Sequence, residues 1–208
     1  MPDWDDVFAK KGKYFTKPHP DMERLAKLFS EKRVQRILDL GCGTGRHLLY
    51  LLKRGFKVYG LDGSPNGLEI AKNWLTEENL SSDLICQKIE HRFPYKNGFF
   101  DAVISIQVIH HNLMKDIMFT VKEVERILKT EGFIFLTFPL LQGFYVKKQN
   151  MKKVETRTYI PLAGQEKGLP HHFFTVAEIK RVFSTFDLSE IYIDETNHRA
   201  ILGQKIEL

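Results

Sequence analysis

The feature that most constrains the fold is a glycine-rich turn between a short apolar run and a segment with helical spacing. Residues 36–40 have the pattern of a buried strand, Gly41, Gly43 and Gly45 follow at alternating positions, and leucines recur at helical spacing over residues 47–54. Glycine lets the backbone turn tightly and lets a ligand approach it closely. A strand, such a turn and a helix in this order indicate the ligand-binding edge of a parallel sheet.

Strand and helix patterns continue to alternate after this turn. Further strands are expected at residues 57–61, 84–89, 101–106 and 133–138, and helices at residues 64–78 and 116–129. This alternation favours an α/β fold with helices on both faces of a sheet. We therefore predict a Rossmann-like, doubly wound, mostly parallel sheet of about seven strands.

The end of the chain has a different pattern. Thr175 and Glu178 form the sequence pattern of a capping box, which begins a helix. Two strand-like stretches follow at residues 188–194 and 200–208, with a turn at Asn197 between them. This order predicts a C-terminal antiparallel hairpin.

The remaining segments complete the expected organisation. An amphipathic helix capped by Asp21 is expected before the first strand. A segment as long as residues 139–174 with only weak periodicity is usually functional or mobile. We expect a single domain over residues 1–208, made of an N-terminal helical lid (1–33), a cofactor-binding core (34–138), a substrate-side loop region (139–174) and a C-terminal helix and hairpin (175–208).

Two aspartates bear on the ligand of the glycine turn. Asp39 stands two residues before Gly41, and Asp62 ends the next expected strand, where a carboxylate can accept hydrogen bonds from ribose hydroxyls. The nicotinamide fingerprint, G-x-G-x-x-G, brings a pyrophosphate to a helix N-terminus. Here the spacing is G-x-G-x-G, and a carboxylate at Asp39 repels a pyrophosphate but attracts an ammonium or a sulfonium. Charge therefore favours S-adenosylmethionine over NAD.

The same residues carry a family resemblance. Residues 39–45, Asp-Leu-Gly-Cys-Gly-Thr-Gly, resemble the first motif of class I S-adenosylmethionine-dependent methyltransferases, and residues 62–64 resemble the next. Residues 93–103 and 128–133 are similar to the stretches that enter the family's fourth and fifth strands. The resemblance covers residues 34–138, about half of the chain. It implies in-line transfer of the sulfonium methyl group to a nucleophile, with S-adenosylmethionine as the cofactor.

The resemblance also implies roles for individual residues. The glycine turn cradles the methionine portion, Asp39 acts near the methionyl ammonium and Asp62 is the ribose ligand. The family often has an acid at the end of the third strand that contacts the adenine amino group. Alignment places Ile89 there and Glu90 one position later, so either Glu90 or backbone groups bind the adenine. The expected cofactor contacts are Asp39, Gly41, Cys42, Gly43, Thr44, Gly45, Asp62, Gly63, Ser64, Glu90 and Gln107.

Histidines and aromatic residues are candidates for the substrate side. His110 and His111 follow the fourth expected strand, at the edge that faces the transferable methyl group, and are candidate catalytic residues. His171 and His172 end the long loop region, and Tyr14 belongs to the expected lid. A lone histidine is more often structural, and a base is needed only if the nucleophile starts protonated.

The sequence leaves the methyl acceptor open. A lid and a long loop that enclose a small molecule are the favoured arrangement. Residues 105–111 are also similar to the fourth-strand segment of tRNA wobble-uridine methyltransferases, and the basic cluster at residues 147–153 is compatible with RNA. A non-catalytic subunit that binds S-adenosylmethionine is a further alternative.

Composition excludes some other classes of protein. The 208 residues carry a net charge of +5, which permits an anionic partner without requiring one. No apolar run approaches the roughly 20 residues that cross a bilayer, so no membrane association is expected. The cysteines, histidines and aspartates show no metal-ligand spacing, and no metal is expected. The acidic N-terminus lacks the order of a signal peptide, so the expected location is cytoplasmic.

Overall fold

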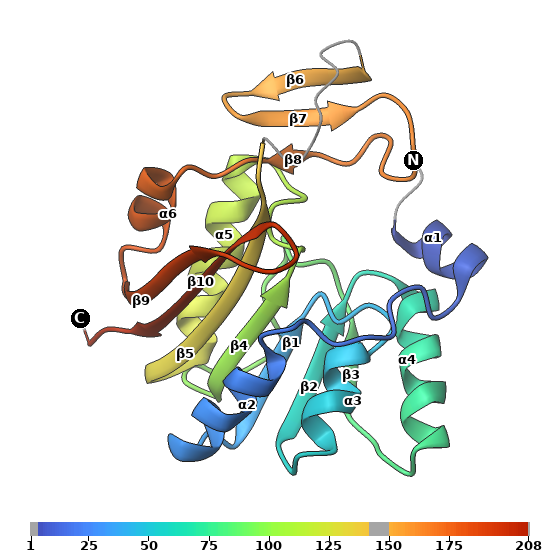
Figure 1. Cartoon of the computed structure of the whole chain (residues 1–208), viewed down its shortest axis with the longest axis vertical. Helices are drawn as coiled ribbons and strands as arrows, with labels where there is room; N and C mark the ends of the chain where they lie inside the picture. The colour runs from blue at the N-terminus through green and yellow to red at the C-terminus, as the bar shows by residue number, and fades with distance from the viewer. Residues whose placement is uncertain (1–3, 142–149, 208) are drawn as a thin grey trace.

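A seven-stranded sheet forms the centre of the protein, which a computed structural model describes at residues 4–141 and 150–207 (Figure 1). Its strands are β1 (Arg36–Leu40), β2 (Lys57–Asp62), β3 (Asp83–Cys86), β4 (Phe100–Ile106), β5 (Leu128–Pro139), β9 (Phe186–Ile193) and β10 (His198–Lys205). Their order across the sheet is β3-β2-β1-β4-β5-β10-β9. Neighbours among β1 to β5 are parallel, whereas β10 is antiparallel to both β5 and β9. The predicted mostly parallel sheet with a C-terminal antiparallel hairpin is confirmed.

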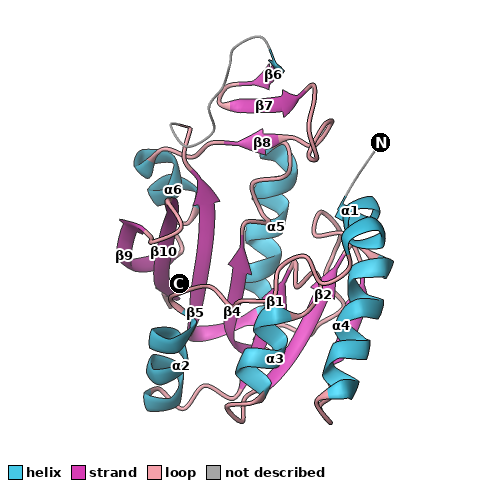
Figure 2. Cartoon of the chain, turned by 45° about the vertical axis from the view of Figure 1, so that its right-hand side comes forward, coloured by secondary structure: helices cyan, strands magenta, loops and turns pink. Residues whose placement is uncertain are grey.

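Helices cover both faces of this sheet (Figure 2). Buried side chains of α2 (Met22–Glu31), α3 (Arg46–Leu52) and α4 (Pro65–Glu77) form one core with one face of the sheet. Those of α5 (Met114–Ile127) and α6 (Val176–Val182) form another core with the opposite face. Ile37 and Leu38, adjacent on β1, belong to different cores because successive strand residues point to opposite faces.

The helix starts follow the sequence signals at two positions and depart from them at a third. Ser64 caps α4, with its side chain accepting a bond from Gly67 N, and Thr175 forms the predicted capping box of α6. The expected capping by Asp21 is wrong, because its side chain makes no cap hydrogen bond to α2. Its carboxylate instead accepts bonds from Arg24 and from the hydroxyl of Tyr192 on β9, which occupy both oxygens.

The third strand ends earlier than expected. The apolar pattern predicts residues 84–89, whereas β3 comprises Asp83–Cys86. Ile89 extends the pattern because its side chain is buried in the core beside α5, although it lies in the turn after the strand. The side chain of Thr120 on α5 donates to the Ile89 carbonyl and holds this turn in place.

The expectation that residues 139–174 lack clear structure is wrong for those that are described. β6 (Met151–Glu155), β7 (Thr158–Pro161) and β8 (His171–His172) form a small antiparallel sheet beyond the carboxyl ends of the parallel strands (Figure 1). Periodicity did not indicate them because β8 has only two residues and β6 is largely exposed. The sheet is attached to the core where His172 N donates to the carbonyl of His110 at 2.9 Å.

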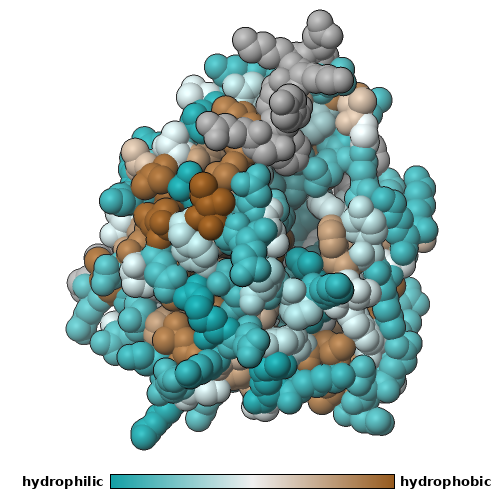
Figure 3. Space-filling view, viewed as in Figure 1, coloured by the Kyte–Doolittle hydropathy of each residue, from teal (hydrophilic) through white to brown (hydrophobic). Residues whose placement is uncertain are grey.

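The surface is mainly hydrophilic on the face drawn in Figure 3, with hydrophobic side chains gathered between α6 and the β9–β10 hairpin. None of the helices in the described part of the chain combines the length and the apolar character needed to cross a membrane.

Candidate functional site

The glycine turn between β1 and α3 has a left-handed backbone. The φ angle is +77° at Gly41, +52° at Gly43 and +89° at Gly45, values that side chains with a Cβ rarely adopt. Space is restricted as well, because a Cβ on Gly41 would lie 2.3 Å from the side chain of Val108 and one on Gly45 would lie 2.9 Å from Ala71. Conformation and packing therefore both require glycine.

Asp62 closes this turn from the end of β2. Its Oδ2 accepts a hydrogen bond from Gly43 N at 2.8 Å, and its Oδ1 accepts one from Ser64 N at 2.8 Å. Burial raises the pKa of Asp62, while these backbone hydrogen bonds oppose the rise. A carboxylate offers about four lone-pair positions, so each oxygen can accept a further bond from a ligand hydroxyl. The structure thus brings Asp62 together with the glycine turn.

Asp39 is buried beneath the turn, with 1% of its surface exposed. Neither of its carboxylate oxygens has a hydrogen-bond partner among the described residues, and the nearest ring nitrogen, His47 Nδ1, is 3.9 Å from Oδ2. Burial raises the pKa of Asp39 to about 7; Arg46 opposes this rise and Asp62 adds to it. Burying a carboxylate without a partner is unfavourable, and a cationic ligand group beside it would offset that cost.

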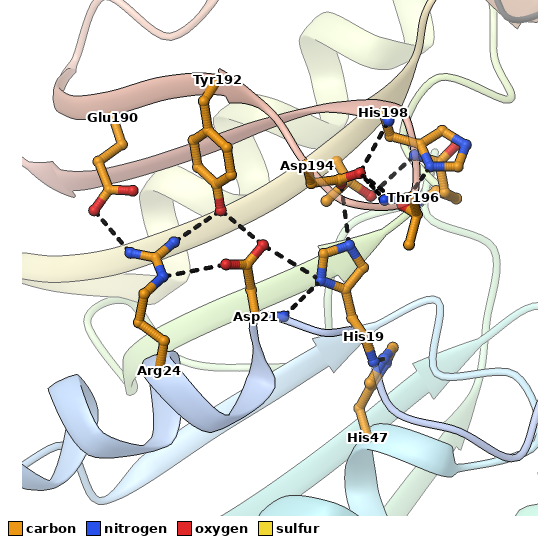
Figure 4. Close-up of polar contacts among 11 residues, drawn as sticks. His19, Asp21, Arg24, His47, Glu190, Tyr192, Asp194, Thr196 and His198 are labelled. Atoms are coloured by element: carbon orange, nitrogen blue, oxygen red, sulfur yellow. Dashed lines mark hydrogen bonds and ion pairs between the residues drawn. The ribbon is translucent and has the colours of Figure 1, made fainter.

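A buried polar network extends from His47, beside Asp39, to the C-terminal hairpin, and Figure 4 shows it from His47 onward. His47 Nε2 accepts a bond from His19 N at 3.2 Å, which leaves the proton on Nδ1, the atom nearest Asp39. His19 Nδ1 accepts from Asp21 N, and its Nε2 therefore donates to Asp194 Oδ2 at 3.1 Å. Burial, followed by nearby positive charge, lowers the pKa of His47 well below its usual value and keeps the ring neutral.

Other predicted cofactor residues lie around the same turn. Thr44 and Cys42 are buried, and the Cys42 sulfur points towards Gly60 in the core, so only the backbone of Cys42 remains for a ligand. Gln107, which has a φ of +62°, is bound through N and Nε2 to the hydroxyl of Thr137. The side chain of Gln107 is therefore held against β5.

The predicted adenine side is at the ends of β2 and β3. Gly63 follows Asp62, and a Cβ there would lie 3.5 Å from Lys88, in ordinary van der Waals contact. Glu90 is half-buried in the turn after β3, at the same edge of the sheet, because β3 is parallel to β2 and pairs Cys86 with Asp62.

Three histidines meet beside the end of β4. The ring centroids of His110 and His111 are 3.9 Å apart, and the ring of His171 lies 4.5 Å from His111 and 5.6 Å from His110. Glu166 is adjacent, with its Oε2 3.0 Å from His171 Nε2 and its Oε1 3.8 Å from His111 Nε2. About sixty residues separate the two parts of this cluster in the sequence. The expectation of no metal was based on the spacing of possible ligand residues along the sequence. That spacing does not reveal a cluster whose members come from two distant segments.

The electrostatics of this cluster favour neutral rings at His110 and His111 beside an ionised acid. Burial, followed by the charge of His171, lowers the pKa of His111 to about 4. Burial and the neighbouring imidazoles lower the pKa of His110 well below its usual value. Burial raises the pKa of Glu166, but the hydrogen bond from His171 and the charges of His111 and His171 together outweigh it, so the net shift is downward.

His172 lies apart from these three histidines. Its Nδ1 pairs with the hydroxyl of Thr158 at 2.8 Å, and its ring packs on Phe174 with centroids 4.5 Å apart. The predicted substrate-side pair is thus divided, with His171 in the cluster and His172 in the small sheet.

The N-terminal helix α1 (Trp4–Lys11) lies over the glycine turn. The Asp5 carboxylate accepts bonds from Ser64 Oγ at 2.6 Å and from Asn66 N at 2.9 Å, which attaches α1 to the start of α4. Phe8 is buried against the turn, because a Cβ on Gly43 would lie 3.1 Å from its ring.

A pocket of about 400 Å³ lies between the N-terminal segment and the loop after β7. Its lining residues are Trp4, Tyr14, Phe15, Pro161, Ala163, Gly164, Gln165 and Glu166. Lys11 Nζ donates to Gln165 Oε1 across the opening at 2.5 Å. The ring of Trp4 is 6.3 Å from that of His111, so the pocket adjoins the histidine cluster.

Two residues of the site were not singled out from the sequence. Glu166 belongs to a segment rich in glycine and lysine, and its spacing of five residues before His171 was the only available signal. Asp5 is one of three acidic residues near the N-terminus, and nothing local distinguishes it from Asp3 and Asp6.

Comparison with known proteins agrees with this architecture. Residues 38–136 match the family described as methyltransferase domain. The ubiquinone biosynthesis O-methyltransferase of Bartonella bacilliformis is 29% identical over 101 residues, which are 49% of this chain and 40% of that protein. The chain therefore matches well under half the length of this curated relative.

Two solved structures show the same fold. A protein from Pyrococcus horikoshii OT3 is similar over 96% of this chain and 98% of its own, with a TM-score of 0.75 and 18% identity. The 1,6-didemethyltoxoflavin-N1-methyltransferase of Burkholderia thailandensis, solved with 1,6-didemethyltoxoflavin and S-adenosylhomocysteine, has a TM-score of 0.64 and 14% identity over 97% of this chain and 82% of its own.

The domain match over residues 38–136 coincides with the part of the sheet that carries the glycine turn, Asp39 and Asp62. The chain therefore carries a methyltransferase domain with the fold of the class I S-adenosylmethionine-dependent methyltransferases.

Proposed function

We propose that this methyltransferase transfers the methyl group of S-adenosylmethionine to a small molecule held in the pocket beneath the N-terminal segment. The observation that carries the proposal is that pocket, whose volume of about 400 Å³ is in the range of small-ligand sites. It is lined by three aromatic side chains and an acid and lies beside the histidine cluster at the end of β4.

The residues around the glycine turn fit the cofactor. The buried carboxylate of Asp39, which has no hydrogen-bond partner among the described residues, would hold the methionyl ammonium directly or through water. Asp62 can accept bonds from ribose hydroxyls in addition to those it accepts from Gly43 and Ser64. At Gly43 the bare backbone faces the ring of Phe8 on α1, which a side chain there would meet. When bound, the cofactor supplies an electrophilic methyl group on a sulfonium.

The protein contributes alignment and exclusion of water. Trp4, Tyr14 and Phe15 would contact the flat faces of an acceptor, and α1 would act as a lid held by Asp5. Glu166, ionised on the pocket wall, would attract an acceptor with a positive or hydrogen-bond-donating group. The predicted catalytic residues, His110 and His111, would face the acceptor from the end of β4.

The test separates acceptor classes. The protein is incubated with methyl-labelled S-adenosylmethionine and either a metabolite extract below about 1 kDa or bulk tRNA, and label transfer is measured. We expect label in the small-molecule fraction. Transfer to tRNA alone would replace the proposal with the RNA alternative. Binding of S-adenosylhomocysteine without transfer to either fraction would favour a non-catalytic subunit.

A matched pair of variants tests the pocket itself. Phe15 and Phe119 are similarly exposed, at 41% and 39%, but only Phe15 lines the pocket. Phe15→Ala should raise the KM for the acceptor several-fold and leave the affinity for S-adenosylhomocysteine unchanged. Phe119→Ala should change neither quantity, and equal effects of the two substitutions would remove the pocket from the proposal.

A further inference from the structure

The histidine cluster at the end of β4 has the composition of a metal site. One ring nitrogen from each of His110, His111 and His171 lies within 4.8 Å of the other two. Imidazole nitrogen is a preferred ligand of zinc and of its neighbours in the first transition row. Three histidines that converge from two distant segments are also a donor set found in catalytic zinc sites.

The polar atoms of the cluster are incompletely satisfied by the described protein. The Nδ1 atoms of His110 and His111 are buried and have no hydrogen-bond partner among the described residues. A buried polar atom without a partner is unfavourable. A bound cation would use such a lone pair, which gives these two side chains a reason to be buried together.

The third ring is oriented as a metal ligand commonly is. His171 Nδ1 is 3.0 Å from the carbonyl of Leu169, and that carbonyl fixes the proton on Nδ1. The Nε2 atom donates to Glu166 in the metal-free protein, and release of that proton on metal binding would free its lone pair. Ligating histidines generally donate their other N–H to a carbonyl or carboxylate in this way.

A carboxylate is next to the three rings. Oε2 of Glu166 lies 3.0 Å from Nε2 of His171, and Oε1 lies 3.8 Å from Nε2 of His111. Ligand atoms of a tetrahedral zinc ion are about 3.3 Å apart, given bonds of about 2.0–2.1 Å. The nitrogens must therefore approach one another by up to about 1.5 Å, a distance that rotation of the histidine side chains can cover.

From this arrangement we propose that His110, His111 and His171 bind a divalent transition-metal ion of the zinc type, with Glu166 as the adjacent carboxylate. The proposal gives the histidines a role other than proton acceptor, because a lone pair engaged by a metal cannot take a proton. A coordination position not filled by protein would face the pocket that Glu166 lines. An oxygen or nitrogen of the methyl acceptor would bind there, and this last step alone rests on the proposed function.

The test uses the full chain after removal of metal with a chelator. Calorimetric titration with Zn²⁺ should show one equivalent bound with micromolar or tighter affinity, and Co²⁺ should give the visible absorption bands of tetrahedral coordination. His171→Ala should weaken Zn²⁺ binding at least about 100-fold, and Glu166→Gln about 10-fold. The result that would overturn the proposal is weak or substoichiometric Zn²⁺ binding by the wild type.

Controls separate this site from adventitious binding and from misfolding. His91 and Cys86 are exposed and lie outside the cluster, so His91→Ala and Cys86→Ser should leave Zn²⁺ binding unchanged. Each variant is also titrated with S-adenosylhomocysteine, whose binding depends on the glycine turn rather than on the cluster. Retained cofactor binding shows that His171→Ala is folded, and unchanged Zn²⁺ affinity in that folded variant would contradict the proposal. A wild type that binds Zn²⁺ but transfers no methyl group to the small-molecule fraction would instead count against the proposed function alone.

Discussion

Asp39 combines a ligand-binding position with a burden on the stability of the protein. Its carboxylate is buried, lacks a hydrogen-bond partner in the described residues and has a pKa raised to about 7 by burial. A group whose pKa is higher in the folded than in the unfolded protein contributes stability that is fully present below its unfolded pKa. This contribution is lost as the pH rises through its folded pKa. Without ligand, the protein should therefore lose stability from Asp39 between about pH 4 and pH 7.

Replacing this carboxylate separates the two effects. Asp39→Asn should raise the Tm of the ligand-free protein at pH 8, because the buried negative charge is absent. It should also weaken binding of S-adenosylhomocysteine about 10-fold or more, because the attraction of the ammonium is lost. The affinity of the wild type should rise from pH 6 to pH 8, whereas that of the variant should stay flat. Calorimetry and thermal unfolding at both pH values measure these changes, and a variant with wild-type affinity would exclude Asp39 from the site.

The glycine turn could be predicted from the sequence more readily than the contacts around it, for a physical reason. The turn that carries Gly41, Gly43 and Gly45 is local, and its strained backbone and close packing can be satisfied only by glycine. Glu166 and Asp5 have their roles only through contacts with residues distant in the sequence. No periodicity or local motif marks such contacts, so both were missed.

The element proposed to act as a lid over the site is α1. It has eight residues, of which only Val7 and Phe8 are buried, so its position depends on the bonds from Asp5 to the start of α4. Ser64 already uses its oxygen to cap α4, and its hydroxyl proton is donated to Asp5. The start of α4 is thus the attachment point of α1.

Removing this attachment should release the N-terminal segment. In Asp5→Ala, trypsin should cleave among the lysines at residues 10–17 several-fold faster than in the wild type, because opening becomes more frequent. The core should remain intact, which mass spectrometry of the products would show. Glu31→Ala removes an exposed carboxylate from α2 and serves as the control. Equal cleavage rates in all three proteins would mean that Asp5 does not hold the helix.

The strands of the core were easier to predict than the small sheet. β4 is buried and rich in branched apolar residues, so its pattern is evident over most of its length. β6 is largely exposed, and β8 is only His171–His172, which is shorter than any period that could reveal it. Ile89 shows the opposite error, since its burial in the core mimics the continuation of a strand.

At the scale of the whole molecule, buried polar contacts join segments that are far apart in the chain. His19 links Asp194 in the C-terminal hairpin to His47 on α3 (Figure 4), and His47 Nδ1 lies 3.9 Å from Asp39 Oδ2. Asp194 also accepts bonds from Thr196 and His198 within its own turn. The network connects the hairpin, α2 and the floor of the cofactor site.

This network gives a pH-dependent contribution to stability. Burial raises the pKa of Asp194, but bonds from His198, Thr196 and His19 outweigh it and leave the pKa lowered. The stabilising contribution of Asp194 is therefore present above its unfolded pKa, near 4. It is lost as the pH falls through its lower folded pKa. Asp194→Ala should reduce the free energy of unfolding at pH 7 by about 2–3 kcal/mol.

Denaturant unfolding at several pH values measures this contribution. The difference between the wild type and Asp194→Ala should be constant from pH 7 to pH 5 and should shrink below about pH 4. Glu195→Ala removes the neighbouring exposed carboxylate and should have little effect. A difference independent of pH down to pH 3 would show that the Asp194 charge contributes nothing.

The attachment of α1 to α4 also sets an order of events during synthesis. Ser64 and Asn66 lie 59 and 61 residues after Asp5, and a ribosome adding roughly 5–20 residues per second reaches them seconds later. An isolated eight-residue helix is not stable in water, so α1 forms only after the first half of the sheet is available to receive it. α1 is therefore made before the residues that hold it and takes up its position after them. As the proposed lid, it would repeat this folding step at every exchange of ligand while the core stays folded.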